Sequence, residues 1–166
     1  MRFMGYIGQW RRAAKEVLDR TTIAVNFLCW FHITGNYLCT PCHAYGVSML
    51  PTLNVTGDVL LAEHVSPRLG KVSYGDLVLV KSPLNPKLRV TKRVIALEGD
   101  TVTYFDPLHS EASQVAVVPK GHVWIQGDNI YASHDSRYYG PVPYGLIEGK
   151  VFFRVWPPDD FGLLGQ

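Results

Sequence analysis

Short runs of alternating hydrophobic and polar residues fill the chain from about residue 45 onward. They are separated by glycine, proline and acidic turn residues, which is typical of β-strands. No helical period lies between the runs, so we expect a compact, mainly β domain. The expected strands are residues 58–65, 76–81, 88–97, 101–105, 122–126 and 147–156, and the expected loops are 106–113 and 127–140.

The first part of the chain has a different pattern. No Asp, Glu, Lys or Arg occurs from Thr21 to Gly57, and residues 23–33 are strongly apolar. The residues before this stretch are rich in Arg and Lys, and a basic flank of this kind favours a membrane anchor. A bilayer crossing needs about 20 mainly apolar residues, and Asn26 and His32 weaken this stretch. A buried or interfacial helix is therefore the alternative to a membrane-anchoring helix.

Length and charge limit the possible organisation. The chain has 166 residues, enough for one domain and a small appendage. We expect an N-terminal basic segment and membrane anchor at residues 1–40, followed by the β-rich domain at residues 41–166. The positive-inside rule would keep the N-terminus on the side where the protein is made or imported. A formal net charge of only +2 gives no basic face, so we expect no nucleic-acid partner.

Cys39-Thr40-Pro41-Cys42-His43 matches the pattern of c-type haem attachment. However, Pro41 lies where such a segment would begin a helix, and the rest of the chain is β-rich, so we expect no haem. Cys39 and Cys42 could form a disulfide in an oxidising compartment or stay as thiols. The scattered histidines do not complete a zinc site, and we expect neither a metal nor another cofactor.

Lys92 is one of two residues with candidate chemistry, and it lies in the strand run 88–97. Alternate residues of a strand share a face, so Lys92 shares its face with Val90, Val94 and Ala96. Apolar surroundings disfavour the charged ammonium and lower its pKa, which would leave a lysine amine able to act as a base. Taken alone, Lys92 is better interpreted as an edge-strand lysine whose stem covers the core while its amine reaches water.

Ser48 is the second candidate, in Gly46-Val47-Ser48-Met49-Leu50-Pro51-Thr52-Leu53. A serine hydroxyl is a poor nucleophile until a base takes its proton, and a neutral lysine can be that base. Taken alone, Ser48 could equally be a turn serine ahead of Pro51. The two residues therefore indicate a catalytic site only when they are considered together.

Their joint context resembles the type I signal peptidase family of membrane-bound serine proteases, which use a Ser/Lys dyad. The segment around Ser48 looks like the nucleophile box of that family. The other matching boxes follow in the family's order: Gly75-Asp76-Leu77-Val78, Lys92-Arg93-Val94-Ile95 with Glu98-Gly99-Asp100, and Gly127-Asp128-Asn129 through Ser133-His134-Asp135-Ser136-Arg137.

Within the family the chain is most similar to the mitochondrial inner membrane branch. Residues 121–129, 140–143 and 155–158 fit that branch, as does the short catalytic region. Asp135-Ser136-Arg137 favours its subunit 1 type over the sister subunit.

The resemblance implies a role for each matching residue. Ser48 would be the nucleophile, Lys92 the general base, and Ser133 the partner that orients the lysine amine. Other residues would support the site without reacting. Asp128, Asp135 and Arg137 would hold the last loop against the active site, while the Ser48 backbone, Gly46 and Met49 would lie at the oxyanion and substrate-binding region.

Gly46 is a departure from the family pattern. Bacterial members often carry a serine two residues before the nucleophile, and its hydroxyl helps to bind the oxyanion. With glycine at this position, the oxyanion hole would rest on the Ser48 backbone N–H and a donor that the sequence does not identify. Losing one such donor can cost on the order of 10²-fold in rate.

The resemblance also implies a function and a location. We expect a membrane-anchored serine endopeptidase that removes sorting or signal peptides from precursor proteins. It would lie in the mitochondrial inner membrane with its catalytic domain facing the intermembrane space, together with a sister peptidase subunit. The alternatives are an inactive β-rich partner subunit and a self-cleaving repressor-type Ser/Lys protease. A triad of Asp135 with His134 or His64 is a further, weaker alternative for the site.

Overall fold

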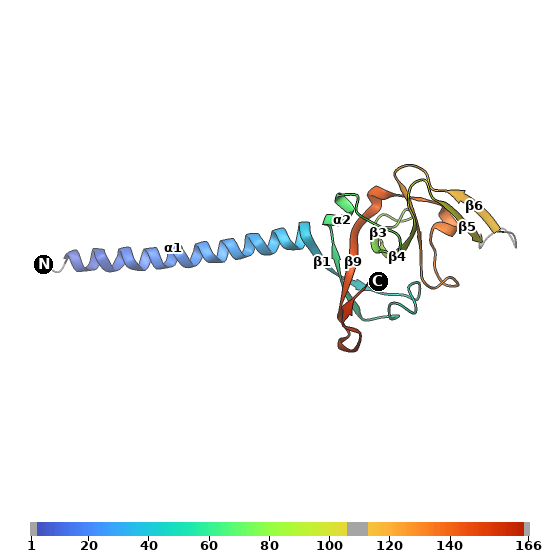
Figure 1. The fold of residues 1–166 in the computed structure, drawn as a ribbon. Helices are drawn as coiled ribbons and strands as arrows, with labels where there is room; N and C mark the ends of the chain where they lie inside the picture. Colours follow the sequence, from blue (N-terminus) through green and yellow to red (C-terminus); the bar gives the residue numbers. More distant parts are fainter. Residues whose placement is uncertain (1–2, 106–112, 165–166) are drawn as a thin grey trace. The chain divides into compact units, whose positions relative to one another are not determined.

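The chain forms two structural units, Met1–Leu38 and Cys39–Gln166 (Figure 1). The computed structural model describes residues 3–105 and 113–164. The loop expected at 106–113 therefore lies outside the described residues except for Ser113, which begins a strand.

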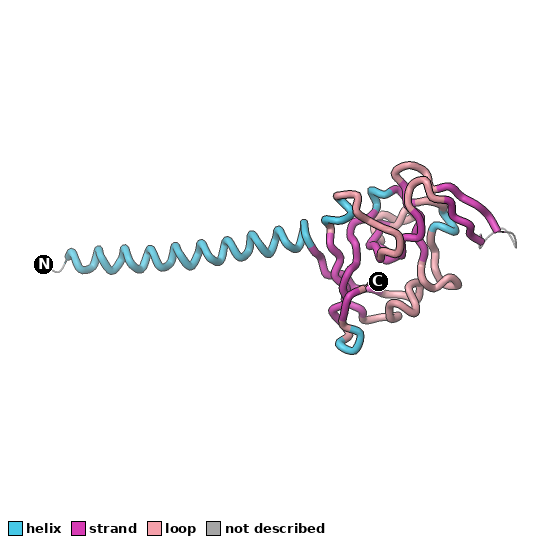
Figure 2. The backbone as a smooth tube through the Cα atoms, viewed as in Figure 1, coloured by secondary structure: helices cyan, strands magenta, loops and turns pink. Residues whose placement is uncertain are grey.

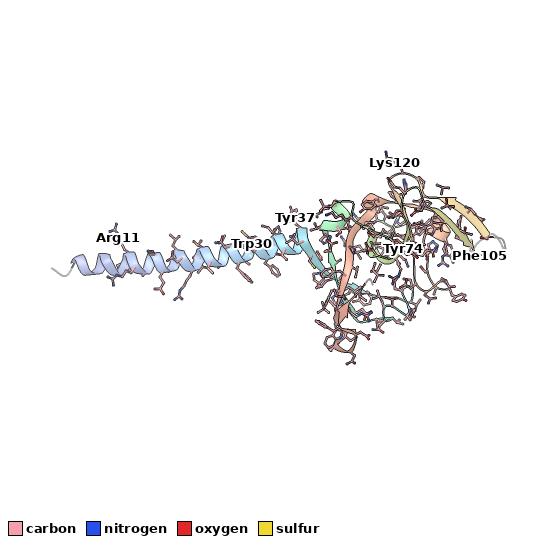
Figure 3. The ribbon with its side chains drawn as sticks, viewed as in Figure 1. Arg11, Trp30, Tyr37, Tyr74, Phe105 and Lys120 are labelled. Carbon is pink, nitrogen blue, oxygen red and sulfur yellow. The ribbon has the colours of Figure 1, made fainter. Side chains whose placement is uncertain are left out.

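The first unit is a helix, α1 (Phe3–Ile33), which continues into a π-helical turn, η1 (Thr34–Leu38). The chain has no proline before Pro41, so no residue in this segment interrupts the backbone hydrogen bonds. Arg11 and Trp30 are exposed on the helix (Figure 3). Among the described residues, no helix combines the length and the apolar character needed to cross a membrane. Membrane anchoring by residues 1–40 stays a prediction.

The second unit is built on one sheet with the strand order β1-β2-β9-β3-β4-β7-β8 (Figures 1 and 2). All neighbouring strands run antiparallel. The strands are β1 (Cys39–Ala44), β2 (Asp58–Glu63), β3 (Leu77–Lys81), β4 (Arg89–Ala96), β7 (His122–Gln126), β8 (Val142–Pro143) and β9 (Ile147–Trp156), and β10 (Gly162–Leu163) pairs with β9. The expectation of a mainly β domain after an N-terminal helix is confirmed.

Two further strands, β5 (Thr101–Phe105) and β6 (Ser113–Val117), form a separate ribbon. Figure 3 shows Phe105 near the end of this ribbon. Where the connecting segments of this unit are described, their helices are short: α2 (Val65–Arg68), α3 (Ser136–Tyr139), η2 (Tyr144–Leu146) and η3 (Pro158–Asp160).

The expected strands 101–105, 122–126 and 147–156 have the bounds of β5, β7 and β9. Those expected at 58–65, 76–81 and 88–97 are slightly shorter in the structure, as β2, β3 and β4. The sequence pattern missed β1, β6 and the two-residue strands β8 and β10. Each of these four pairs with a single neighbouring strand, so none needs the continuous apolar pattern of a strand buried inside a sheet.

A hydrophobic cluster in the centre of the β unit places the segment that carries Ser48. Met49 and Leu53 are 3% and 2% exposed and pack in this cluster with residues of β2, β3 and β9. Burying two large apolar side chains stabilises the segment by roughly 1.5–3 kcal/mol each. The loop between β1 and β2 is therefore fastened to the sheet on the C-terminal side of Ser48.

Candidate active site

Lys92 lies on β4 and is only 3% exposed. Its neighbours on the same face, Val94 and Ala96, are also buried, as the alternation along the strand predicts. The pKa of Lys92 is lowered to about 8, mainly by burial, while the negative charges of Asp135 and Asp128 oppose the shift and the positive charge of Arg137 supports it. A lysine in this position is neutral in a useful fraction of molecules near pH 8.

The amine of Lys92 is held by the hydroxyl of Ser133. Lys92 Nζ donates a hydrogen bond of 3.0 Å to Ser133 Oγ, and Ser133 Oγ donates one of 2.6 Å to Asp135 Oδ2. Because the single hydroxyl proton of Ser133 goes to the carboxylate, its lone pairs face the amine. Ser133 and Asp135 are both buried, at 4% and 0% exposure. These two successive hydrogen bonds thus fix the orientation of the Lys92 amine.

Asp135 is the central acceptor of the loop between β7 and α3. Arg137 donates to it through Nε at 2.8 Å and through Nη2 at 2.9 Å, and the backbone N–H of Gly127 donates at 2.9 Å. Burial alone would raise the pKa of Asp135, but the hydrogen bonds from Arg137, Gly127 and Ser133 outweigh it and lower that pKa. Asp135 therefore stays ionised and keeps Ser133 oriented.

Gly127 brings this loop against the segment that carries Ser48. A Cβ atom at Gly127 would lie 2.2 Å from Ser133 Oγ and 2.4 Å from the carbonyl oxygen of Ser48. Only a residue without a side chain allows both segments to approach so closely. The backbone of Ser48 and the hydroxyl that orients Lys92 thus meet at one point. In the described part of the chain, no hydrogen bond joins Ser48 Oγ to Lys92 Nζ.

Gly46 closes the loop around Ser48, and its N–H donates to the Val55 carbonyl at 2.8 Å. Its φ of +106° lies in a region that residues with side chains rarely adopt. A serine at this position would be strained in this backbone conformation. Met49, which was expected near the substrate, points its side chain into the core.

A second ion pair lies next to the first network. Arg93 Nε and Nη2 donate to Asp128 at 2.8 and 2.7 Å, and Thr52 Oγ1 donates to the same carboxylate at 2.5 Å. Burial would raise the pKa of Asp128, but these hydrogen bonds lower it overall. The pair connects the β4 strand, the loop after β7 and the segment that follows Ser48.

The order and spacing of these residues are those of a known protein family. The model of the signal peptidase family, peptidase S26, matches residues 15–108 and 105–156 of the chain. The chain belongs to the signal peptidase family. It is thus a serine protease of the signal peptidase type rather than a self-cleaving repressor.

Relatives of this signal peptidase cover from 69% to 99% of its length. Mitochondrial ATP-independent inner membrane protease subunit 1a of Arabidopsis thaliana is 58% identical over 165 residues, which are 99% of this chain and 98% of the relative. Mitochondrial inner membrane protease subunit 1 of Mus musculus is 44% identical over 140 residues, which are 84% and 83% of the two chains. The subunit 2 of Mus musculus is 41% identical over 118 residues, which are 69% and 65%. These relatives place this signal peptidase among the proteases of the mitochondrial inner membrane.

The histidines proposed for an alternative triad lie elsewhere. His64 bonds through Nε2 to Thr40 Oγ1 at 2.8 Å and through Nδ1 to the Glu148 carbonyl at 2.6 Å. His134 is exposed and stacks on Tyr138, with ring centroids 4.3 Å apart. Among the described residues, neither histidine bonds to Asp135, whose partners are named above. The arrangement in this signal peptidase favours the lysine.

Sequence reasoning gave no supporting role to four residues that the structure brings into the site: Thr52, Arg93, Gly127 and Asn129. All four lie in the sequence segments that resemble the family motifs, so these motifs could have identified them.

A network at the other end of the loop between β1 and β2 was also missed. There Arg154, 7% exposed, donates to the Thr52 carbonyl and pairs with Asp160 at 3.1 Å. Its residues are far apart in the chain, and no local pattern joins them.

The three cysteines are free thiols in the structure. Cys39 and Cys42 both lie in β1, where the chain is extended. Within the described residues, no group of three or more His, Cys, Asp or Glu side chains could hold a metal ion.

Proposed function

We propose that this protein removes sorting peptides from precursor proteins delivered to the mitochondrial intermembrane space, with Ser48 as nucleophile and Lys92 as general base. The observation that carries the proposal is the buried Lys92 amine. It is held 3.0 Å from Ser133 Oγ, and that hydroxyl and the Ser48 carbonyl both lie against Gly127. Nothing in the described part of the chain offers a histidine at this place.

The chemistry begins with a neutral Lys92. It accepts the hydroxyl proton of Ser48 as Ser48 Oγ attacks the carbonyl carbon of the scissile bond. The resulting ammonium donates its proton to the leaving amine, and the new N-terminus departs from an acyl-enzyme on Ser48. Lys92 then activates a water molecule that releases the first product. In an unliganded enzyme the hydrogen bond between nucleophile and base is often long and tightens only when substrate binds.

The supporting residues act by holding Lys92 and the loop after β7 in position. Ser133 fixes the direction of the amine, and the pair of Asp135 and Arg137 fixes Ser133. Asp128, paired with Arg93, holds the loop after β7 against the segment that follows Ser48. We assign none of these side chains a bond-making step.

The oxyanion of the tetrahedral intermediate would be bound by the backbone N–H of Ser48. Gly46 provides no side-chain donor, and a serine in its place would be strained at this positive φ. The substrate would lie extended and pair with the strands beside Ser48 and Lys92, since an extended peptide can add to a sheet through main-chain hydrogen bonds.

The relatives support part of the proposed location and assembly. Subunit 1 and subunit 2 proteases both resemble this chain, which supports a hetero-oligomer with a sister subunit. We propose that residues 1–40 attach the protein to the inner membrane and that the catalytic unit faces the intermembrane space. The basic residues before Thr21 would then stay on the matrix side.

Trapping the acyl-enzyme tests this proposal. The purified full chain in detergent is mixed with an activated ester of a peptide that ends at the cleavage site of a processed precursor, quenched in acid, and digested for mass spectrometry. We expect the acyl group on the peptide that contains Ser48, and no adduct in Ser48→Ala or Lys92→Ala. Acylation of another residue in the wild type, or of Ser48 at an undiminished rate in Lys92→Ala, would overturn the proposal.

A further inference from the structure

Asn129 connects the loop after β7 to both sides of Ser48. Its backbone N–H donates to the Ser48 carbonyl at 3.1 Å, and its side-chain Nδ2 donates to the Val47 carbonyl at 3.0 Å. Its Oδ1 accepts from the N–H of Tyr131 at 3.2 Å. One residue therefore holds the peptide group before Ser48 and the peptide group after it.

The peptide group before Ser48 is the one that matters for the oxyanion. It contains the Val47 carbonyl and the Ser48 N–H, and it is trans, since the only cis bonds among the described residues precede Pro51 and Pro157. In a planar trans peptide the C=O and N–H groups point in opposite directions. When Asn129 Nδ2 fixes the direction of the Val47 carbonyl, it also fixes the direction of the Ser48 N–H.

The same hydrogen bond makes the Ser48 N–H a better donor. A carbonyl that accepts a hydrogen bond polarises its peptide group, which strengthens the bond donated at the N–H end. The Val47 carbonyl also accepts from the Leu50 N–H, at 3.3 Å, so its position is set from two sides. A well-aimed N–H is needed here because the residue two positions earlier, Gly46, has no side-chain donor.

We propose that Asn129 is a positioning residue for the oxyanion hole, which aims and polarises the Ser48 N–H through the Val47 carbonyl. The inference rests on the proposed role of Ser48 as the nucleophile. Asn129 itself touches no reacting atom. It acts on the transition state, in which negative charge develops on the oxygen, and much less on the bound substrate.

Two substitutions separate this role from a structural one. Asn129→Asp keeps an oxygen for the Tyr131 N–H and keeps the backbone N–H for Ser48, but it loses the donor to Val47. Asn129→Ala loses both side-chain bonds. If activity needs only the local turn at Tyr131, Asn129→Asp should keep the activity that Asn129→Ala loses. If activity needs the hydrogen bond donated to the Val47 carbonyl, both variants should lose activity.

The assay uses the full chain in detergent and a peptide that spans the cleavage site of a processed precursor. We expect kcat to fall about 10- to 100-fold in both variants, because removing a direct oxyanion donor costs about 10²–10³ and this donor acts indirectly. We expect KM to stay within about twofold. Asn85→Asp is the matched control, since Asn85 also accepts a backbone N–H, from Lys87, in an exposed loop. It should cleave like the wild type.

A peptide aldehyde gives the second measurement. Its carbonyl carbon bonds to Ser48 Oγ, the hydroxyl proton passes to Lys92, and the adduct oxygen occupies the oxyanion position. We expect both Asn129 variants to bind the aldehyde about 10- to 100-fold more weakly, with binding of the matching peptide amide within about twofold. A general structural defect would weaken both ligands, and thermal unfolding of each variant shows whether the fold is retained.

Three results would overturn the inference: wild-type kcat in Asn129→Asp, an equal loss of aldehyde and amide binding, or a higher KM at unchanged kcat. Ser48→Ala is measured in parallel. Cleavage by Ser48→Ala would refute the proposed function, whereas an inactive Ser48→Ala with a fully active Asn129→Asp would refute only the role of Asn129.

Discussion

At the scale of single residues, the site depends on an amine kept in apolar surroundings between opposing charges. Lys92 is 3% exposed, and burial is the main reason that its pKa falls to about 8. Asp135 works against this shift and Arg137 works with it. Burial and the balance of the two charges therefore together set the pH range in which Lys92 can act as a base.

The first prediction concerns the pH profile of cleavage. Because neutral Lys92 is the reactive form, kcat/KM should rise with pH along a limb whose apparent pKa is about 8. Asp135→Asn removes a negative charge that raises the pKa, so its limb should move to lower pH. Arg137→Gln removes a positive charge that lowers the pKa, so its limb should move to higher pH. Shifts in the reverse directions would contradict this role for the charges, and Asp159→Asn, an exposed surface change, should leave the limb in place.

The second prediction concerns the cost of burying Lys92. Its pKa is about 8 in the folded protein and 10.5 as the ordinary value, so below pH 8 the folded state holds a charged amine that it disfavours. Lys92→Met should therefore be more stable than the wild type at pH 7, by about 1–3 kcal/mol. The wild type should recover this difference as pH rises from about 8 towards 10.5.

Unfolding in urea at pH 7 and at pH 10 measures the difference. The Met variant should be inactive at both values. Equal stability of the two proteins at pH 7, or an advantage of the variant that grows towards pH 10, would contradict a burial cost at Lys92.

At this scale, the sequence predicted part of the site well. The shared face of Lys92, Val94 and Ala96 follows from strand alternation alone, and those residues are buried together. The contact of Ser133 with Lys92 was predicted only through the family resemblance. The hydrogen bond of Thr52 with Asp128 was not predicted, because 76 residues separate them and no local rule joins them.

At the scale of elements, the site is made where two loops meet on the sheet. The loop between β1 and β2 is fastened by the buried Met49 and Leu53, and the loop after β7 is fastened by Asp135. The strands between them were largely predictable, because β3, β4, β7 and β9 have strong patterns bounded by turn residues. The meeting of the loops was not predictable, since it depends on pairing between strands far apart in the chain.

The third prediction tests this meeting point. Gly127→Ala would place a methyl group 2.2 Å from Ser133 Oγ and 2.4 Å from the Ser48 carbonyl, and the two loops must then separate. We expect kcat/KM to fall by about 100-fold or more, since a displacement of about 1 Å is enough for such a loss. The matched control is Gly145→Ala, because a Cβ there meets nothing within 4 Å. Full activity in Gly127→Ala would show that the loops need not touch.

At the scale of the whole molecule, the chain combines a long helix with a catalytic β unit. The N-terminal helix was expected from the apolar pattern, and α1 confirms it. The uncharged stretch after Arg20, with exposed Phe27, Leu28 and Phe31, is where we expect lipid contact.

The fourth prediction concerns this stretch. Phe27→Asp together with Phe31→Asp places two carboxylates one helical turn apart, each costing about 2.5–3.5 kcal/mol in hydrocarbon. We expect this variant to be released from mitochondrial membranes by alkaline carbonate, while the wild type stays in the pellet. Leu18→Asp, in the charged part of α1, is the control and should stay in the pellet too. Release of the wild type would refute anchoring by residues 1–40.

The central claim, that Ser48 and Lys92 together perform the cleavage, is tested most directly by precursor processing in one set of mitochondrial membranes. Wild type, Ser48→Ala and Lys92→Ala are expressed at equal levels in cells that lack the native protein, and mature product is measured over time. The account predicts processing below about 1% of the wild-type rate in each variant, since residues that act as one unit are lost together. Undiminished processing by either variant would contradict it.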